Sequence, residues 1–336
     1  MWYLPITEKE TEQGGNELYH FGVTEMQGWR PGMEDMHTVS LHVDEERPDS
    51  NAFFAVYDGH GGTVAAEYAH ENLHKRLTED PAYRNQEYRM ALKNAFLSTD
   101  EGMRNSSDFQ EERHKQSGCT AISALLTKNC KIFVANAGDS RAVLSVKGMA
   151  KKLSVDHKPR NSIERSRIKA AGGYVSMERI KAASGYVLME RVNGDLSLTR
   201  ALGDFRYKDN ALLPPEAQII TADPEITEHD ITDDDEFLVV ACDGIWECLG
   251  SQKVVNAVRL LVSEGNELSE VCERICDLCL APDTRGYDYG FDNMTIIVVA
   301  LLHGRTIDEW YEWITDRTRR RFGFNIPTVL PRLYRR

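Results

Sequence analysis

Short apolar segments, some continuous and some alternating with polar residues, predict β-strands along the chain. They lie at residues 19–26, 37–43, 52–57, 237–242 and 294–301. Three more, AISALLT, KIFVANA and RAVLSV, follow one another from residue 121 to residue 146 and are separated only by the turns KNC and GDS. Tight turns join antiparallel neighbours, so we expect each of these three strands to pair antiparallel with the next.

Helical periodicity separates the predicted strands into groups. It appears near residues 62–79 and 85–103, and again near 251–263 and 267–280. Pairs of strands that alternate with pairs of helices are typical of sheets covered by helices, and they argue against a doubly wound parallel sheet. No segment is long enough to serve as a linker, so we expect one catalytic domain.

Composition excludes several classes of function. The chain has 336 residues, 41% of them hydrophobic, and a net charge of -13. Because a chain with this negative charge repels phosphate backbones, we expect no nucleic-acid partner. No run approaches the ~18 apolar residues of a membrane-spanning helix, so we expect no transmembrane segment. Seven cysteines without regular spacing indicate reduced thiols. We expect a monomer in the cytoplasm, with the nucleus as an alternative.

Three of the cysteines raise the question of a zinc site. Cys272, Cys276 and Cys279 are spaced four and three residues apart and alternate with apolar residues. This spacing fits the buried face of a helix better than a set of metal ligands.

Four aspartates lie at the margins of apolar strands. Asp58 and Asp243 directly follow AFFAVY and FLVVAC, Asp139 lies in the GDS turn, and Asp292 precedes the segment that begins at residue 294. One Asp-Gly pair alone would indicate an ordinary turn. Four carboxylates beside a buried core are costly to desolvate unless a cation offsets their charge. Oxygen ligands favour Mg²⁺ or Mn²⁺ over Zn²⁺.

Arg30 and His60 lie close in sequence to these acids. Arg30 belongs to MQGWRPGMEDMH, and an arginine can bind two phosphate oxygens at once. His60 follows Asp58 by two residues, and a histidine of near-neutral pKa can act as a general acid. Taken alone, Arg30 would more often form a surface ion pair and His60 a structural hydrogen bond.

Nine motifs occur in a fixed order between residues 20 and 302. They are MQGWRPGMEDMHT, FFAVYDGHGG, SGCTA, ANAGDSRAVL, DHKP, RIKAAGGYV, RVNGDLSLTRALGDF, VVACDGIWE and FDNMT. The series resembles the metal-dependent Ser/Thr protein phosphatases of the type 2C, or PPM, family. The resemblance implies an α+β fold, a four-layer αββα sandwich of two antiparallel β-sheets flanked by antiparallel helix pairs, with a flap subdomain. It places an N-terminal extension at residues 1–18, the phosphatase domain at 19–302 with the flap at about 155–210, and a C-terminal extension at 303–336.

The resemblance also implies a mechanism. Two Mg²⁺ or Mn²⁺ ions would activate a bridging water, which attacks the phosphoryl group of phosphoserine or phosphothreonine proteins without a covalent enzyme intermediate. Arg30 would bind the phosphoryl group, and His60 would protonate the leaving oxygen. The residues implied for metal binding or its support are Asp58, Gly59, Asp243, Asp292, Glu34 and Asp35. Asp58 would bridge the two ions, Glu34 would hold a water, and Asp35 would support the site.

A third metal ion is a further expectation. In the family it binds the aspartate of the GDS turn and an aspartate four residues after the one in ACDG. Here Asp139 is present, but Glu247 occupies the second position. Glutamate keeps the charge and moves the oxygen outward by one methylene, so we expect this site to survive weakly.

Two segments break the pattern of strands and helices. Residues 168–179 and 180–191 are a tandem duplication with ten of twelve positions identical. Since it lies in the flap, we expect it to alter which phosphoproteins bind; a surface insertion without a role stays open. The tail, residues 317–336, has seven arginines and no Asp or Glu. It could dock on the protein itself, on a partner or on an anionic membrane, or be solvated.

Two other functions remain as alternatives. The chain could be an inactive phosphatase-like protein with a regulatory or binding role, but such relatives lose a metal aspartate or the phosphate-binding arginine, and both kinds of residue are present here. It could also be another two-metal phosphohydrolase, against which the full motif series argues.

Overall fold

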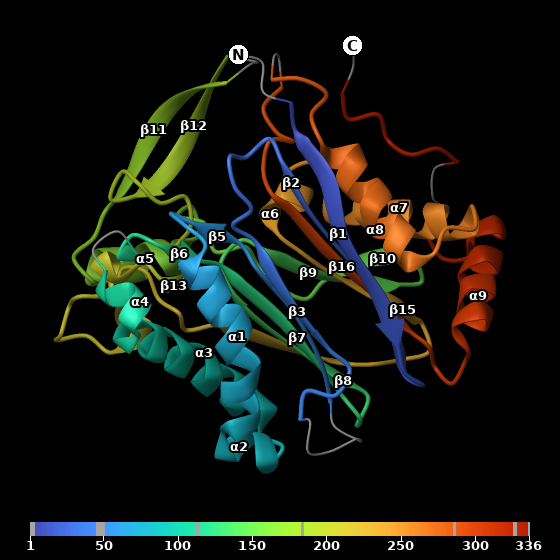
Figure 1. Cartoon of the computed structure of the whole chain (residues 1–336), viewed down its shortest axis with the longest axis horizontal. Coiled ribbons are helices and arrows are strands. Elements are labelled where there is room, and N and C mark those ends of the chain that lie inside the picture. The colour runs from blue at the N-terminus through green and yellow to red at the C-terminus, as the bar shows by residue number, and fades with distance from the viewer. Residues whose placement is uncertain are drawn as a thin grey trace.

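Two antiparallel β-sheets lie face to face at the centre of the molecule (Figure 1). The computed structural model describes residues 4–44, 51–111, 114–182, 185–284, 287–324 and 328–334. One sheet has the order β1 (Ile6–Gly15), β2 (Tyr19–Gly28), β16 (Met294–Leu301), β15 (Asp235–Ala241), β9 (Arg141–Val146) and β10 (Met149–Lys152). The other has the order β14 (Glu225–Asp230), β8 (Lys131–Ala137), β7 (Ala121–Thr127), β4 (Ala52–Tyr57) and β3 (Met36–Ser40).

The core between the sheets explains why their strands are so apolar. Phe21 and Ile297 from the first sheet and Phe54 and Ile122 from the second belong to one buried cluster. The outer faces of the same strands are covered by helices, so β4, β7 and β16 are buried at every position. Burial on both faces produces continuous apolar runs instead of alternation.

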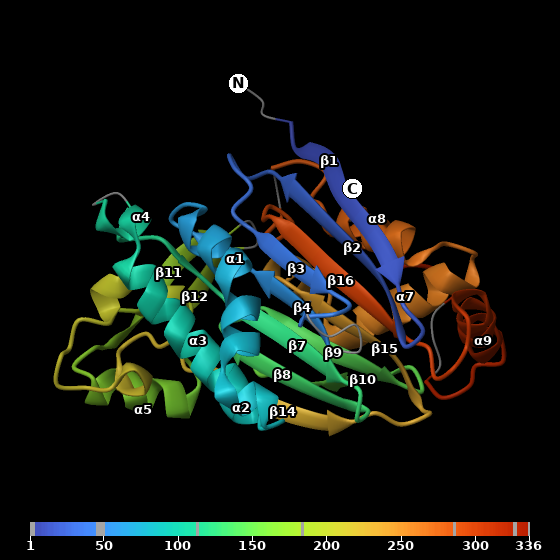
Figure 2. The same cartoon turned by 60° about the horizontal axis from the view of Figure 1, so that its bottom comes forward.

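Helices cover both outer faces. The helices α1 (Val64–Glu79) and α3 (Tyr88–Asn105) pack on the five-stranded sheet, as Figure 2 shows. The helices α7 (Ser251–Ser263) and α8 (Leu268–Cys279) pack on the six-stranded sheet. The predicted four-layer α+β sandwich is therefore confirmed. The three cysteines of α8 are fully buried in this packing, as their helical spacing predicted.

The expected pairing of KIFVANA with RAVLSV is wrong. These segments are β8 and β9, and they belong to different sheets: β8 pairs with β7 and β14, whereas β9 pairs with β15 and β10. The GDS turn carries the chain across the sandwich instead of folding it back. Gly138 in this turn has φ of 141°, and a Cβ there would lie 2.4 Å from Thr120 Cβ. Both strands face the same core, so their apolar patterns cannot distinguish a hairpin from a crossing.

The flap is built from α5 (Ser162–Ala170) and the hairpin of β11 (Val175–Ala182) and β12 (Gly185–Val192). The hairpin extends beyond the body of the sandwich (Figure 1). Identical sequences from the duplication take different structures here: residues 168–170 end the helix, whereas residues 180–182, also IKA, end a strand. Residues 183–184, and the side chains of residues 178–189, lie outside the described part.

Shorter elements connect these layers. They are α2 (Pro81–Arg84), α4 (Ser107–Gln110), α6 (Asp243–Trp246), a small sheet of β5 (Gly59–His60), β6 (Gly118–Cys119) and β13 (Leu202–Gly203), and 3-10 turns at Phe205–Tyr207 and Pro215–Ala217. Within the described part of the chain, no helix is long and apolar enough to span a membrane. The division of the chain into two extensions and a phosphatase domain stays a prediction, although β1 adds an edge strand to the six-stranded sheet.

The C-terminal region is joined to the sandwich by buried charges. Helix α9 (Ile307–Arg319) packs on α7, and its Arg317 donates to Glu236 Oε1 over 3.0 Å. Arg259 of α7 lies 3.4 Å from Glu236 Oε2 and donates to the carbonyls of Phe322 and Phe324. The first part of the arginine-rich tail therefore docks on the protein's own body; Arg335 and Arg336 lie outside the described residues.

Candidate metal centre and active site

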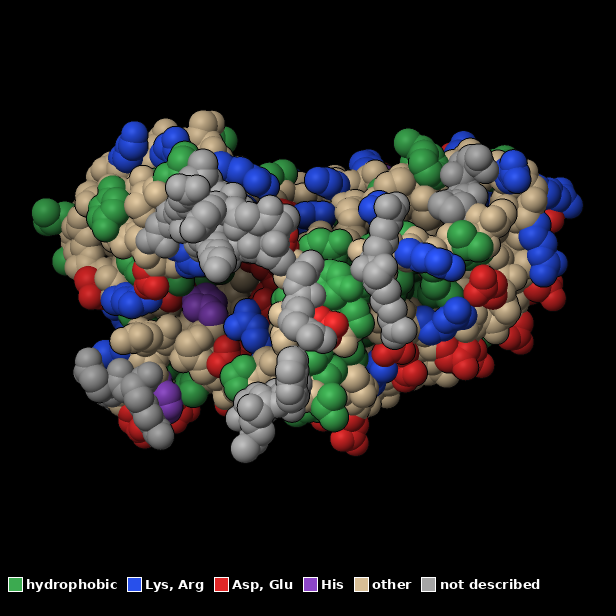
Figure 3. Space-filling model, turned by 90° about the horizontal axis from the view of Figure 1, so that it is seen from above, with side chains coloured by type: hydrophobic (Ala, Val, Ile, Leu, Met, Phe, Trp, Pro, Cys, Tyr) green, Lys and Arg blue, Asp and Glu red, His purple; other side chains and the backbone are tan. Residues whose placement is uncertain are grey.

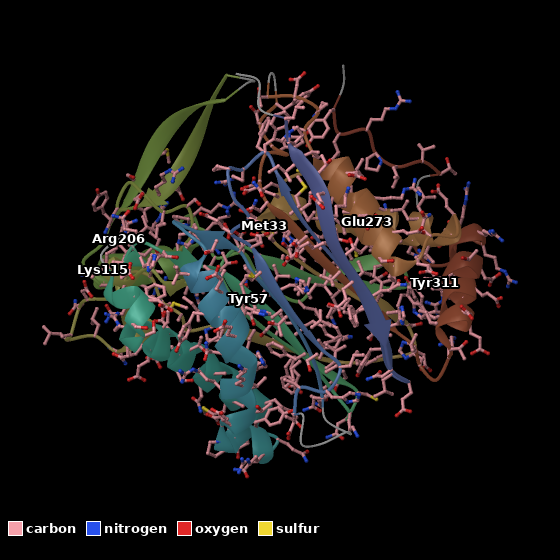
Figure 4. All side chains as sticks on the ribbon, viewed as in Figure 1. Met33, Tyr57, Lys115, Arg206, Glu273 and Tyr311 are labelled. Atoms are coloured by element: carbon pink, nitrogen blue, oxygen red, sulfur yellow. The ribbon has the colours of Figure 1, made fainter. Side chains whose placement is uncertain are left out.

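Strand ends bring three of the predicted aspartates together. Tyr57, labelled in Figure 4, ends β4 and is followed by Asp58, while Asp243 follows the buried end of β15 and begins α6. Asp139 lies in the crossing between the sheets. Asp58, Asp139 and Asp243 each offer a carboxylate oxygen within 4.8 Å of those of the other two.

Electrostatics show that this cluster fits a divalent cation. Burial, followed by the charges of Asp243 and Asp35, raises the pKa of Asp58 well above its usual range. Burial and the charge of Asp139 do the same to the pKa of Asp243. Three carboxylates at this spacing repel one another, and an Mg²⁺ or Mn²⁺ ion held between them would offset that repulsion.

A second group of potential ligand atoms also includes Asp58. Asp35 and Cys242 each have a ligand atom within 4.8 Å of the other and of Asp58. Asp35 accepts a hydrogen bond from Thr295 Oγ1 over 2.8 Å, and burial raises its pKa to about 7. The Cys242 thiol is occupied by the backbone, since its sulfur accepts from Thr295 N over 3.1 Å. This arrangement fits the supporting role predicted for Asp35.

Glu34 and Gly59 meet at close range. A Cβ at residue 59 would lie 2.2 Å from the Glu34 carbonyl oxygen, so this position requires glycine. Glu34 Oε1 accepts from Gly62 N over 3.1 Å, which ties the two loops together. Met33, labelled in Figure 4, marks the loop that carries Glu34.

The predicted residue Asp292 lies beside Asn293, which organises this loop. Asn293 Oδ1 accepts from Glu34 N over 3.0 Å, and its Nδ2 donates to the carbonyls of Gln27 and Gly32. Asn293 was missed as a site residue; its place next to Asp292 in the FDNMT motif was the available signal.

Arg30 points toward the carboxylates from the rim. Its Nη2 donates to Asp292 Oδ2 over 2.7 Å, and its side chain is 53% exposed. Asp58 and Asp243 are close enough to act with Asp292 in raising the pKa of Arg30, against the effect of burial. An exposed guanidinium beside acids that a cation would engage is suited to receive a phosphoryl group.

His60 is held by an aspartate that sequence reasoning missed. Its Nε2 lies 2.7 Å from Oδ2 of Asp204, which is fully buried. Burial lowers the pKa of His60, but the charge and hydrogen bond of Asp204 outweigh it and raise the pKa. Asp204 is 144 residues away along the chain, in RALGDF, so spacing gave no sign of the pairing.

A lysine pairs with Asp139, one of the two residues expected to hold a third metal ion. Lys158, from the DHKP motif, forms an ion pair with Asp139. Burial lowers its pKa, but the charges of Asp139, Asp243 and Glu247 outweigh this and raise it. Lys158 was also missed. Asp139, Glu247 and Lys158 line one cavity, and the lysine is the cation that pairs with Asp139 there; a third metal ion at this place stays a prediction.

Figure 3 views this end of the molecule and shows a hollow with acidic and histidine side chains at its edge. The two sheets meet here, and the carboxylates come from both of them. The arrangement offers oxygen ligands for cations, a guanidinium for an anion and an imidazole for a proton.

The chain is similar to known proteins along most of its length. The family model described as protein phosphatase 2C matches residues 19–287. The chain is 44% identical over 315 residues to protein phosphatase 2C homolog 2 of Schizosaccharomyces pombe, covering 93% of this chain and 81% of the relative. It is 40% identical to probable protein phosphatase 2C 21 of Arabidopsis thaliana, with 88% of this chain and 90% of the relative covered.

Solved structures share the fold at lower identity. A phosphatase from Toxoplasma gondii superposes with a TM-score of 0.71 at 24% identity, over 88% of this chain and 95% of that one. A sex-determining protein of C. elegans superposes with a TM-score of 0.72 at 23% identity, over 90% and 68% of the two chains. The family model and the curated relatives together cover most of the sequence. The chain therefore belongs to the protein phosphatase 2C family of Ser/Thr phosphoprotein phosphatases.

Proposed function

We propose that this phosphatase depends on two Mg²⁺ or Mn²⁺ ions held around Asp58, with a weaker third site at Asp139 and Glu247. The observation that carries the proposal is the convergence of the Asp58, Asp139 and Asp243 carboxylates within 4.8 Å. When bound, a pair of divalent cations would supply an activated water near neutral pH and offset charge on the phosphoryl oxygens. A protein nucleophile is then unnecessary.

Arg30 binds and orients the phosphoryl group in this proposal. Its hydrogen bond to Asp292 leaves half of the side chain exposed, so the guanidinium can exchange that contact for two phosphate oxygens. Asp292 is then released to the cation site.

His60 supplies the proton that the serine or threonine oxygen needs on leaving. Asp204 engages Nε2, so Nδ1 is the nitrogen left to face the leaving group. Asp204 acts through His60: it fixes the ring and favours the protonated form, which is the form a general acid requires.

Phosphoprotein substrates are the proposed partners, and the enlarged flap is proposed to select among them. In support, Met177 and Glu190 of the hairpin line the same 550 Å³ cavity as Asp139, Asp243 and Glu247. The duplicated segment thus borders the opening through which a phosphorylated side chain would enter.

Hydrolysis of a phosphothreonine peptide tests the proposal directly. EDTA should abolish turnover, added Mn²⁺ should restore it, and Asp58→Asn should lose at least about a hundredfold in kcat with Mn²⁺ present. The matched control is Asp230→Asn, on the edge strand β14 away from the cluster, which should keep normal activity. Turnover that resists EDTA would contradict the proposal.

A further inference from the structure

A second cavity opens on the Arg30 side of the carboxylate cluster. It has a volume of about 830 Å³ and shares Arg30, Glu247 and Asp292 with the candidate site. The rest of its wall comes from the start of β1 and the residues before it, the end of β2 with the loop after it, and the loop before β16. Its apolar members are Leu4, Ile6, Trp29, Pro31, Tyr289 and Phe291, and its polar members include Gln27, Thr284 and Asp288. Its volume lies in the range of ligand pockets.

The aromatic walls are held by contacts with one another and with residues outside the cavity. Trp29 Nε1 donates to the carbonyl oxygen of Ala281 over 2.9 Å, and its ring meets that of Phe291 edge-on with centroids 6.4 Å apart. Tyr289 packs against Tyr334 with centroids 5.6 Å apart. Because these rings have partners that hold them, an occupant finds a preformed surface and pays little to order it.

The cavity exposes apolar side chains at the protein surface. Leu4 and Ile6 are 84% and 48% exposed. Figure 3 shows hydrophobic side chains gathered beside the hollow at this end of the molecule. Contiguous exposed apolar surface rimmed by polar residues marks a binding surface.

Charge argues against an acidic occupant. Glu247, Asp288 and Asp292 line the cavity and would repel an acidic side chain, while Arg30 is already paired with Asp292. The apolar wall makes an apolar side chain the occupant that this cavity favours, and a Lys-containing peptide is the competing outcome that the test must separate.

We propose that this cavity binds an apolar side chain of the substrate, one or two residues from the phosphorylated residue. The inference rests on the proposed function, because Arg30 must hold the phosphoryl group. Arg30 also lines the cavity, and residues in an extended peptide advance by about 3.3 Å each, so a near neighbour of the phosphorylated residue reaches the apolar wall. The apolar cavity thus sets local sequence preference, whereas the carboxylates set the chemistry.

Matched phosphothreonine peptides test this, with Leu, Phe, Ala, Lys or Asp at each of the two positions on either side. We expect kcat/KM for Leu or Phe to exceed that for Ala by about tenfold at one position, with Lys and Asp no better than Ala. Ile6→Glu should abolish the Leu preference and leave p-nitrophenyl phosphate turnover unchanged. Leu18→Glu is the control, since Leu18 is exposed to a similar extent, 41%, but lies outside the cavity.

Every outcome of these assays either supports or overturns the inference. Equal kcat/KM for all peptides, a preference for Lys or Asp, or equal effects of Ile6→Glu and Leu18→Glu would overturn the inference. So would a Leu preference that appears only after residues 1–3 are deleted, because the cavity would then belong to the chain's own N-terminus. Peptides that are all turned over without discrimination refute only this inference, whereas loss of EDTA sensitivity refutes the proposed function. Thermal unfolding and p-nitrophenyl phosphate turnover establish that each variant is folded.

Discussion

Glu236 holds the C-terminal region through charges that are buried, so removing its charge should weaken the whole fold. The side chains of Glu236 and Arg259 are both 0% exposed. Glu236 also accepts from Ser145 Oγ over 2.8 Å, from Gly148 N over 3.1 Å and from Arg317. The substitution Glu236→Gln keeps the shape, leaves Arg259 without this counter-charge and leaves Arg317 with only Asp234, 4.0 Å away.

The expected loss is large for a single substitution. Breaking a buried ion pair by removing one partner typically costs about 3–5 kcal/mol of unfolding free energy, because an uncompensated charge stays buried. Unfolding entropy near 60 °C is about 2.1 cal/mol/K per residue, or roughly 0.7 kcal/mol/K for 336 residues. The melting temperature should therefore fall by about 4–7 °C.

Thermal unfolding followed by circular dichroism measures this change. Glu264→Gln is the matched control, since Glu264 is 43% exposed and pairs with Arg274 at the surface, away from Glu236. Such a pair is worth about 0–1 kcal/mol, so the control should melt within about 1–2 °C of the unmodified protein. Turnover of p-nitrophenyl phosphate at 25 °C should be unchanged in both, since Glu236 and Asp243 lie near opposite ends of β15. Equal melting temperatures for the two variants would refute the reasoning.

The remaining predictions concern the active site and the flap. Lys158→Met should strengthen Mn²⁺ binding at the third site by about tenfold in calorimetry, because Asp139 loses a competing cation; unchanged affinity would show that the lysine does not compete. Asp204→Asn should lower kcat by about 10- to 100-fold and move the alkaline limb of the pH profile of kcat to lower pH, because His60 loses the carboxylate that raises its pKa. If kcat fell at every pH while the alkaline limb stayed at the same pH, the role of Asp204 would be purely structural. Deleting residues 180–191 should change kcat/KM among phosphoproteins and spare p-nitrophenyl phosphate; lost turnover of the small substrate would contradict this.

Much of the sandwich could be predicted from local patterns because its strands are short, buried and sharply bounded. The strands predicted at 52–57 and 294–301 were found with those bounds. Strand β1 was missed because an exposed edge strand such as ITEKETEQGG has no apolar pattern. The crossing at the GDS turn was missed because strands of both sheets bury their side chains in the same core.

In the candidate site, too, some residues could be predicted from local sequence and others could not. Asp58 and Asp243 could be predicted as a set, because several carboxylates at the margins of buried strands are costly to desolvate, whereas one Asp-Gly pair alone would indicate a turn. Asp204, Asn293 and Lys158 act through contacts with His60, Glu34 and Asp139, and these contacts join segments that only the tertiary structure brings together. The spacing of these residues along the sequence does not predict such pairs.

Adding or removing a copy of the duplicated segment would change the length of the flap hairpin by a fixed amount. Val175 pairs with Val192 at the base of the hairpin, and the copies meet nearer its far end. With residues 180–191 removed, these two valines would have four residues between them in a shorter loop and could still pair. Each added copy would lengthen both strands by six residues, or about 20 Å, without disturbing the base. Copy number could therefore change how far this phosphatase extends toward a protein substrate while its catalytic centre stays the same.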